Sequence, residues 1–277
     1  LERTLVAGGA LLLRAGQAEF EPSFNYTYRK DDVPAAVVGG DAIGGPGEDL
    51  FIGSRDVERD EFTPSATLRI GLPFDAQVEL GLPYNIVRQV TQPADNEDTG
   101  HGVGDLSIGF AKTLAREAGW RPDIVGRVVY DSGIGNKSDN NVVLDGGFSD
   151  IIAQIVALKR QDPLAFVATA SYNYYFEDDN DKPGNQVSLS LGALMATSPE
   201  TTIRVQLQQN FRNDTEIDGR VVNGSDQNEG ILLLGASSIL GRGILLDVSA
   251  GAGLTDDAPE YFVQVALPIR FNLPFVR

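Results

Sequence analysis

Short stretches in which apolar and polar residues alternate recur along the whole chain. The clearest covers 185–197, where one side carries Val187, Leu189, Leu191, Ala193 and Met195. A period of two residues predicts a β-strand with two unlike faces. A soluble sheet turns its polar face to bulk water, whereas an outer-membrane barrel turns its apolar face to lipid and its polar face to a wet lumen. The alternation alone leaves both interpretations open.

The alternation predicts about twelve strands, at 19–28, 58–70, 76–90, 104–113, 123–132, 148–158, 164–176, 186–197, 202–213, 230–240, 244–255 and 261–271. The links between them are alternately long, at 29–57, 91–103, 133–147, 177–185, 214–229 and 256–260, and short, at 71–75, 114–122, 159–163, 198–201 and 241–243. Extracellular loops and periplasmic turns alternate in this way. The sequence therefore predicts an all-β fold, a twelve-stranded antiparallel transmembrane β-barrel with a short amino-terminal plug segment.

Two further patterns favour this barrel over a soluble sandwich or lipocalin-like barrel. Aromatic residues gather near strand ends, where interfacial girdles form, at Tyr26, Tyr28, Trp120, Tyr130, Tyr172, Tyr174, Tyr175, Phe176 and Phe271. The last predicted strand alternates up to an aromatic residue, as outer-membrane barrels tend to end, although 272–277 extend beyond it. We therefore expect the protein in the bacterial outer membrane, in contact with the lipid bilayer and lipopolysaccharide.

Composition removes several classes of protein. The chain has 22 Lys and Arg against 39 Asp and Glu, a net charge of −17, so no nucleic-acid partner is expected, because such a partner requires a basic footprint. The longest apolar run, 5–13, is shorter than the about 20 residues of a transmembrane helix. With no cysteine, disulfides, thiolate metal sites and thiol nucleophiles are excluded together.

The amino-terminal segment is apolar but belongs to no predicted strand. We assign 1–17 to a plug or linker and 18–277 to the barrel, with the plug residues Leu5, Val6, Leu11, Leu12 and Leu13. Strands 148–158 and 230–240 carry apolar residues on both faces, at 151–152 and 231–234, and a segment inside the lumen would cover their inner side. The alternatives are a disordered or packed tail and the hydrophobic region of an export signal. Because the sequence starts at Leu1 rather than Met, we expect a processed or truncated chain.

Charged residues at the polar positions of the strands are expected to line the lumen, since in lipid each would cost several kcal/mol. They are Glu19, Glu21, Arg69, Glu79, Asp105, Arg127, Asp131, Arg204, Arg212, Asp247 and Arg270. Their role is either to pair with one another between strands or to select solutes. Because both signs occur, strong selectivity for anions or cations is not expected.

The sequence offers little for catalysis or metal binding. His101, the only histidine, has neither the nearby serine of a barrel phospholipase nor a visible acidic partner of the omptin type. The run 179–184 resembles the start of a calcium loop, but Ser190 stands where the bidentate glutamate belongs. We therefore predict no enzyme, no catalytic or metal site and no cofactor.

Several segments resemble the outer-membrane barrels of the putative phenol-degradation (MetA-pathway) family. They are 8–12, 19–26, 59–72, 78–84, 102–106, 121–122 and 131–133. Within this family the chain most resembles the functional-amyloid (Fap) secretion channels of pseudomonads. That resemblance implies a plugged twelve-stranded barrel, a homotrimer joined by a periplasmic coiled coil, and an unfolded amyloid subunit as cargo. No heptads are present here, so the residues themselves give no argument for a trimer.

The sequence and the resemblance together lead to a functional hypothesis. The chain is predicted to form a bacterial outer-membrane channel that exports unfolded functional-amyloid subunits in biofilm formation and is gated by its amino-terminal plug. The alternative is a passive outer-membrane pore for the uptake of small aromatic or hydrophobic compounds, which the family name suggests. A barrel enzyme is a third and weaker alternative, because no nucleophile–base pair is visible.

Overall fold

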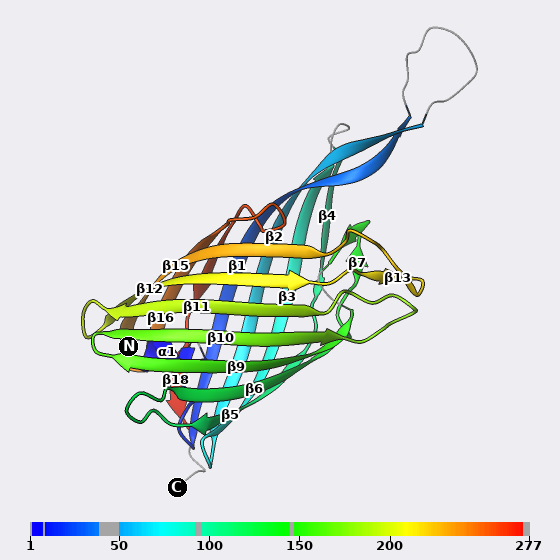
Figure 1. Ribbon diagram of the computed structural model, residues 1–277. Helices are drawn as coiled ribbons and strands as arrows, with labels where there is room; N and C mark the ends of the chain where they lie inside the picture. The colour runs from blue at the N-terminus through cyan, green and yellow to red at the C-terminus, as the bar shows by residue number, and fades with distance from the viewer. Residues whose placement is uncertain (1, 8, 39–49, 92–95, 145–146, 274–277) are drawn as a thin grey trace, which may run out of the picture.

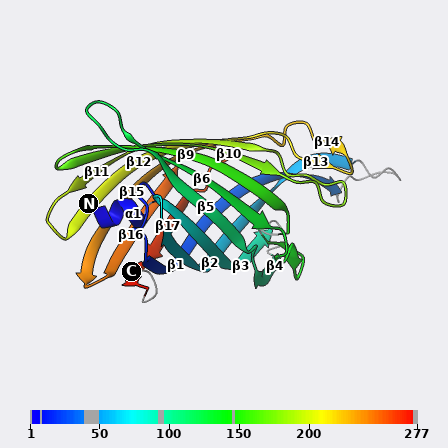
Figure 2. The same cartoon turned by 90° about the horizontal axis from the view of Figure 1, so that it is seen from below.

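In a computed structural model, the chain forms one closed antiparallel β-barrel with a short helix inside it (Figures 1 and 2). The structure describes residues 2–7, 9–38, 50–91, 96–144 and 147–273. The fourteen strands of the main sheet make twelve transmembrane strands, because two of these are interrupted along their length. The predicted all-β, twelve-stranded barrel is confirmed.

The elements follow one another in an almost purely β order. They are α1 (Glu2–Ala7), β1 (Gln17–Val38), β2 (Leu50–Leu72), β3 (Ala76–Thr91), β4 (Asn96–Val103), β5 (Ser107–Ala115), β6 (Asp123–Ser132), β7 (Ser138–Asp139), β8 (Val142–Val143), β9 (Ser149–Gln161), β10 (Leu164–Tyr175), β11 (Gln186–Ala196), β12 (Thr201–Arg212), β13 (Glu216–Ile217), β14 (Arg220–Val221), β15 (Gln227–Gly241), β16 (Ile244–Gly253), β17 (Tyr261–Ala266) and β18 (Ile269–Asn272). Within the described residues, no helix is long and apolar enough to cross a membrane.

The barrel closes where the first strand pairs with the last. Ser23 of β1 lies opposite Ala266 of β17, and Glu19 lies opposite Arg270 of β18. All the other neighbours in the ring are also antiparallel. Closure matters because the hydrocarbon core offers no water to hydrogen-bond an open sheet edge.

The two faces of the wall are opposite in character to those of a soluble sheet. Leu191 of β11 is 69% exposed on the outer face, together with Leu189 and Leu207 of the neighbouring strand β12. On the inner face, by contrast, Glu19 is 2% exposed and Gln77 is fully buried. An apolar outside and a polar inside are the properties of a barrel whose solvent is lipid.

Aromatic residues of the outer face contact one another close to the loop end of the wall. The Tyr28 and Tyr261 rings stack at 5.3 Å, and Tyr174 meets Phe176 edge-on at 5.3 Å. Trp120 lies exposed in the turn at the opposite end. Rings at the two rims suit the membrane interfaces, where an amphipathic aromatic residue is stable.

Long loops and short turns emerge at opposite ends of the barrel, as the alternation of link lengths predicts. Figure 1 shows α1 and β18, the first and last described elements, at the end with the short turns. This is the periplasmic end in an outer-membrane barrel. In its turn 116–122, Lys159 and Arg160 donate hydrogen bonds to the Glu117 carboxylate and lower its pKa to about 2.

Three predicted boundaries are wrong. The predicted loop 29–57 is mostly strand, because β1 and β2 remain paired up to Val38 and Leu50 and form a long hairpin that projects beyond the barrel (Figure 1). The predicted loop 91–103 contains β4, which pairs with the upper part of β3. The last strand is interrupted between β17 and β18, at Leu267 and Pro268, since proline cannot donate a ladder hydrogen bond. The segment 29–57 is predicted to be a loop because its Gly- and Asp-rich composition indicates exposure to solvent. A strand that extends above the membrane is exposed to solvent as well.

A charge on the outer face tests the orientation of the wall. Leu191→Lys lies near the middle of β11 and is expected to lower the free energy of unfolding by about 2–4 kcal/mol. Ser190→Lys, which points into the lumen, is the matched control and should have a much smaller effect. The measurement is urea-induced unfolding in liposomes, followed by fluorescence. Equal losses in the two variants would contradict the outward orientation of the apolar row.

Candidate functional site

Eight charged side chains form what we call the charged belt, on the inner wall toward the short-turn end. They are Glu19, Glu21, Arg69, Glu79, Arg127, Arg204, Asp247 and Arg270. Arg69 Nη1 lies 3.0 Å from Glu19 Oε1 and 2.8 Å from Glu21 Oε2, and Arg270 Nη2 lies 3.0 Å from Glu19 Oε2. The pairs join β1 to both of its neighbours across the closure of the barrel.

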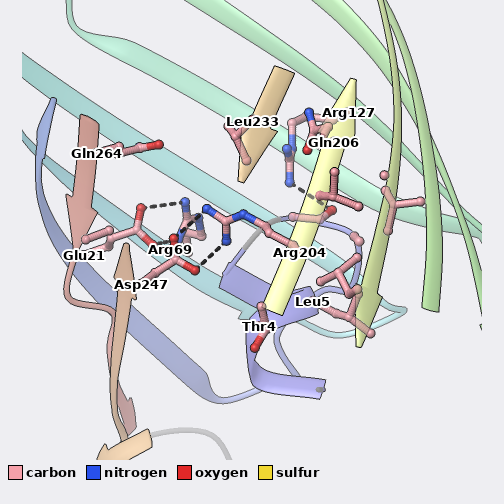
Figure 3. A pocket seen from close by; sticks show the side chains of 17 residues that line it. Thr4, Leu5, Glu21, Arg69, Arg127, Arg204, Gln206, Leu233, Asp247 and Gln264 are labelled. Carbon is pink, nitrogen blue, oxygen red and sulfur yellow. Dashed lines mark hydrogen bonds and ion pairs between the residues drawn. The ribbon is translucent and has the colours of Figure 1, made fainter. Parts of the chain in front are cut away.

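The other belt pairs join strands further around the ring. Arg204 and Asp247 form a two-pronged ion pair, with Nη2 2.7 Å from Oδ1, and Figure 3 shows it beside the pair of Glu21 and Arg69. Arg127 Nε lies 3.2 Å from Glu79 Oε1, and its Nη1 donates to Gln154 Oε1 at 3.0 Å. Each belt charge therefore has a partner of opposite sign, which is what makes its burial tolerable.

The amino-terminal segment, described at residues 2–7 and 9–16, lies inside the barrel at the short-turn end (Figure 2). Leu5 and Ala10 are buried in a cluster with Ala111, Val125, Val156, Leu158, Ala165 and Leu194, against which Leu11 and Leu12 also pack. Val6 and Leu13 are buried as well. The partners differ from the predicted 151–152 and 231–234, because the segment covers the periplasmic ends of β5, β6, β9, β10 and β11.

Three polar contacts hold residues 2–13 of this segment to the wall, and Gly16 at its end donates its N–H to the Gly71 carbonyl and accepts a hydrogen bond from the Leu273 N–H. The hydroxyls of Thr4 and Ser237 lie 2.7 Å apart, the backbone N–H of Leu13 donates to Gln77 Oε1 at 2.9 Å, and Arg127 Nη2 donates to the Gly9 carbonyl at 3.4 Å. Gly9 has a φ of +72°, and a Cβ there would lie 2.4 Å from the Arg127 guanidinium. Only glycine fits this approach to the belt.

Three adjacent cavities follow the lumen. The outer cavity, of about 690 Å³, lies at the loop end; the middle cavity, of about 270 Å³, shares Ile152 with it; and the inner cavity, of about 330 Å³, shares Arg69 and Arg127 with the middle one. The inner cavity ends at Thr4 and Leu5 of the amino-terminal segment (Figure 3). The cavities therefore trace a path from the loops to that segment.

The outer cavity combines aromatic, aliphatic and charged groups. Its lining includes Phe148, Tyr175, Ile152, Asp131, Asp150 and Arg212. Three predicted lumen residues, Asp105, Asp131 and Arg212, therefore lie here rather than in the belt. Arg212 donates to Gln186 Oε1 from Nε at 3.2 Å and from Nη2 at 3.1 Å, so its guanidinium is held against the wall.

The described parts of the loop 133–148, residues 133–144 and 147–148, fold over the outer cavity. Val142 and Leu144 are buried against Val87 of β3, so the hairpin formed by β7 and β8 enters the barrel mouth. Asp105 fixes its two ends, accepting hydrogen bonds from the backbone N–H of Gly135 at 2.7 Å and of Gly147 at 3.0 Å. The sequence predicts Asp105 in the lumen but not this anchoring role. The available signal that the loop folds inward was the apolar run 142–144 within it.

The same loop covers the strand edge that β4 leaves open. Asn136 N–H donates to the Val103 carbonyl at 2.9 Å, and its side-chain Oδ1 accepts from Val103 N–H at 3.0 Å. Asp139 accepts from the His101 N–H at 3.0 Å and lies 3.3 Å from its Nδ1. An acidic partner of His101 thus exists, contrary to the sequence interpretation, because a residue 38 positions away is brought to it. The contact anchors the loop on the exposed rim; no nucleophile accompanies it among the described contacts.

In the described part of the chain, no group of three or more His, Cys, Asp or Glu side chains is arranged to hold a metal ion. The polar groups of the lumen bind mainly one another, and the cavities between them can admit a small solute.

The closed wall with its apolar outside and polar lumen defines an outer-membrane β-barrel channel. Residues 47–271 match the sequence family described as "Putative MetA-pathway of phenol degradation", and the chain belongs to this family. The protein is located in the bacterial outer membrane.

Solved structures share the fold at low sequence identity. An outer-membrane channel from Pseudomonas putida F1 aligns with a TM-score of 0.72 at 14% identity over 95% of this chain and 98% of that one. The translocator domain of the autotransporter NalP from Neisseria meningitidis aligns at 0.61, with 12% identity over 98% and 94%. The transport unit of AIDA-I from Escherichia coli aligns at 0.50, with 8% identity over 98% and 96%. These proteins are channels and translocators, and no catalytic family is indicated.

Removing the central carboxylate of the belt tests its structural role. Glu19→Gln is expected to lower the free energy of unfolding by about 3 kcal/mol, because Arg69 and Arg270 lose a shared buried partner. Glu97→Gln, which removes an exposed carboxylate paired with Arg88, is the control and should change stability much less. Urea titration in liposomes measures both. A Glu19 variant as stable as the control would show that the belt contributes little to the fold.

Proposed function

We propose that the protein is a passive pore for the uptake of small, uncharged aromatic compounds. Of the two channel hypotheses that the sequence suggested, this is the alternative to amyloid export. The observation that carries the proposal is the outer cavity, whose aromatic and aliphatic walls are combined with fixed polar groups. The description of the family, a pathway of phenol degradation, agrees with it. Neither the family nor the matched structures support export of an amyloid subunit or a trimer, and the first hypothesis is therefore not retained.

The size and chemistry of the outer cavity suit a substituted benzene ring. Its volume of about 690 Å³ falls within the range of small-molecule sites, about 300–1,000 Å³. Phe148 and Tyr175 can contact an aromatic ring, and Asp131 can accept a hydrogen bond from a hydroxyl group. A phenol can make both kinds of contact at once, whereas an aliphatic hydrocarbon offers no hydroxyl group to Asp131.

The charges of the cavity disfavour anionic aromatics. Three carboxylates line it, Asp105, Asp131 and Asp150, against two cations, Lys137 and Arg212. Lys137 is paired with Asp178 and lies over the Phe148 ring, so its charge is already compensated. An aromatic carboxylate entering the cavity would therefore meet net repulsion, and a neutral phenol would not.

The amino-terminal segment supplies the gate in this proposal, with residues 1–17 as the plug and 18–277 as the barrel. Thr4, Leu5, Gly9 and Ala10 close the inner cavity on the periplasmic side, and three polar contacts hold residues 2–13 there. A segment held by few polar bonds over an apolar cluster can move as a unit. Passage from the inner cavity to the periplasm requires such a movement.

Blocking the junction between the outer and middle cavities tests the path. Ile152→Trp is expected to lower the uptake of labelled phenol by about tenfold, because the added ring fills the shared lining position. Ile151→Trp is the matched control, since the neighbouring side chain points to lipid. Uptake is measured in vesicles containing lipopolysaccharide, with labelled benzoate as the anionic comparison. Uptake no faster than in protein-free vesicles, or no preference for phenol over benzoate, would contradict the proposal.

A reversible lock tests the gate separately from the path. The chain has no cysteine, and the hydroxyls of Thr4 and Ser237 lie 2.7 Å apart, so the double variant Thr4→Cys, Ser237→Cys can form a disulfide. The oxidised variant is expected to lose most phenol uptake and to regain it on reduction.

Thr201→Cys with Ser238→Cys is the control for this lock. These side chains lie 3.5 Å apart on the neighbouring wall strands β12 and β15, so their disulfide leaves the amino-terminal segment free. Uptake should be the same in the oxidised and reduced states of this control. If the Thr4–Ser237 lock leaves uptake unchanged in both states, the segment is not a gate.

A further inference from the structure

Lys112 is a cation on the face of the barrel that meets lipid. It is exposed, between Phe110 and Leu114 on the outer side of β5. Among the described residues, no acceptor lies within hydrogen-bonding or ion-pair distance of its ammonium group. In contrast, Lys137 and Lys159 have carboxylate partners and Lys182 lies over the Tyr174 ring.

The register places Lys112 at the periplasmic rim of the wall. It lies opposite Ala76, the first residue of β3, and the next residue donates its backbone N–H to Asp75 in the short turn. A lysine at this height can keep its methylene groups along the apolar surface while its ammonium reaches the headgroup level. Its charge therefore faces the phosphates of the inner leaflet.

An apolar groove of about 600 Å³ begins beside Lys112 on the same outer face. Its floor is low because small residues occupy neighbouring strands: Gly126 of β6, Ala153 of β9 and Ala170 of β10. Its sides are formed by larger groups, among them Phe110, Val128, Tyr172 and Val187, which share one row across five strands, with Ala153 of β9 between Val128 and Tyr172. That row lies further from the short-turn end than Lys112.

We propose that this groove is a binding site for a phospholipid of the inner leaflet, with one acyl chain along the groove and its phosphate on Lys112. The charge complementarity selects a phosphate-bearing lipid. The position at the short-turn end selects the inner leaflet, since lipopolysaccharide occupies the leaflet at the loop end. The small residues of the floor allow a chain to lie closer to the wall than on the surrounding surface, so dispersion contacts add to the ionic one.

Lipid retention by the purified protein tests the site. The protein is extracted in detergent, supplied with phosphatidylglycerol, and the bound lipid is counted by native mass spectrometry. We expect wild type to retain a phospholipid, Lys112→Gln to bind it about fivefold more weakly, and Lys112→Arg to bind as wild type does. Ala153→Phe, which fills the floor of the groove, should also reduce retention.

Two matched variants and a second lipid separate the site from ordinary surrounding lipid. Arg242→Gln removes an exposed cation in another short turn, and Ala250→Phe enlarges an outer-face alanine on β16; both should retain phospholipid as wild type does. Diacylglycerol lacks the phosphate, so its binding should be weakened by Ala153→Phe but not by Lys112→Gln. Equal retention by all variants would overturn the site, and equal loss of both lipids in Lys112→Gln would overturn phosphate recognition. Neither outcome bears on phenol uptake.

Discussion

Hydrogen bonding of the backbone in a medium without water is the constraint on which this structure depends. Each transmembrane strand must pair on both edges, and the ring therefore closes through β1 with β17 and β18. Where pairing stops, as on the second edge of β4, other groups replace it: Asn136 and Asp139 of the loop 133–148 bind Val103 and His101 there. That repair brings the loop into the mouth and so creates the roof of the outer cavity.

Closure also determines where the charges go. Polar side chains alternate with apolar ones, so every strand that turns its leucines to lipid turns its charges inward. In a lumen of twelve strands, narrower than a porin, these charges lie close enough to pair, and Glu19, with Arg69 and Arg270, lies at the centre of the resulting belt. The belt holds the seam of the barrel together and leaves separate cavities along the lumen instead of one open channel.

Period-two alternation predicted the number of strands, their pairing and the inner and outer faces, because this pattern is a direct consequence of the pleat. It failed where the wall leaves the bilayer: the upper parts of β1 and β2, and β4, are strands although their composition is that of loops, since no lipid selects apolar residues there. The alternation also could not predict contacts between residues that are distant in the sequence. Asp105 with Gly147 and His101 with Asp139 depend on how the loop 133–148 folds back, which no local pattern encodes.

Arg127 connects the parts of the lumen that the sequence shows only separately. Its side chain contacts Glu79 of the belt, Gln154 of β9 and the Gly9 carbonyl of the amino-terminal segment, and it lines both the middle and the inner cavities. In the proposed gate, a movement of the segment would cost this guanidinium one acceptor and leave it two, so the belt would remain paired. Gly9 is buried and has no side chain to pack against Arg127. The contact between them is therefore a single hydrogen bond rather than a packed interface. In the proposed pore, a neutral solute in the inner cavity would therefore compete with this weak polar contact and not with the buried ion pairs.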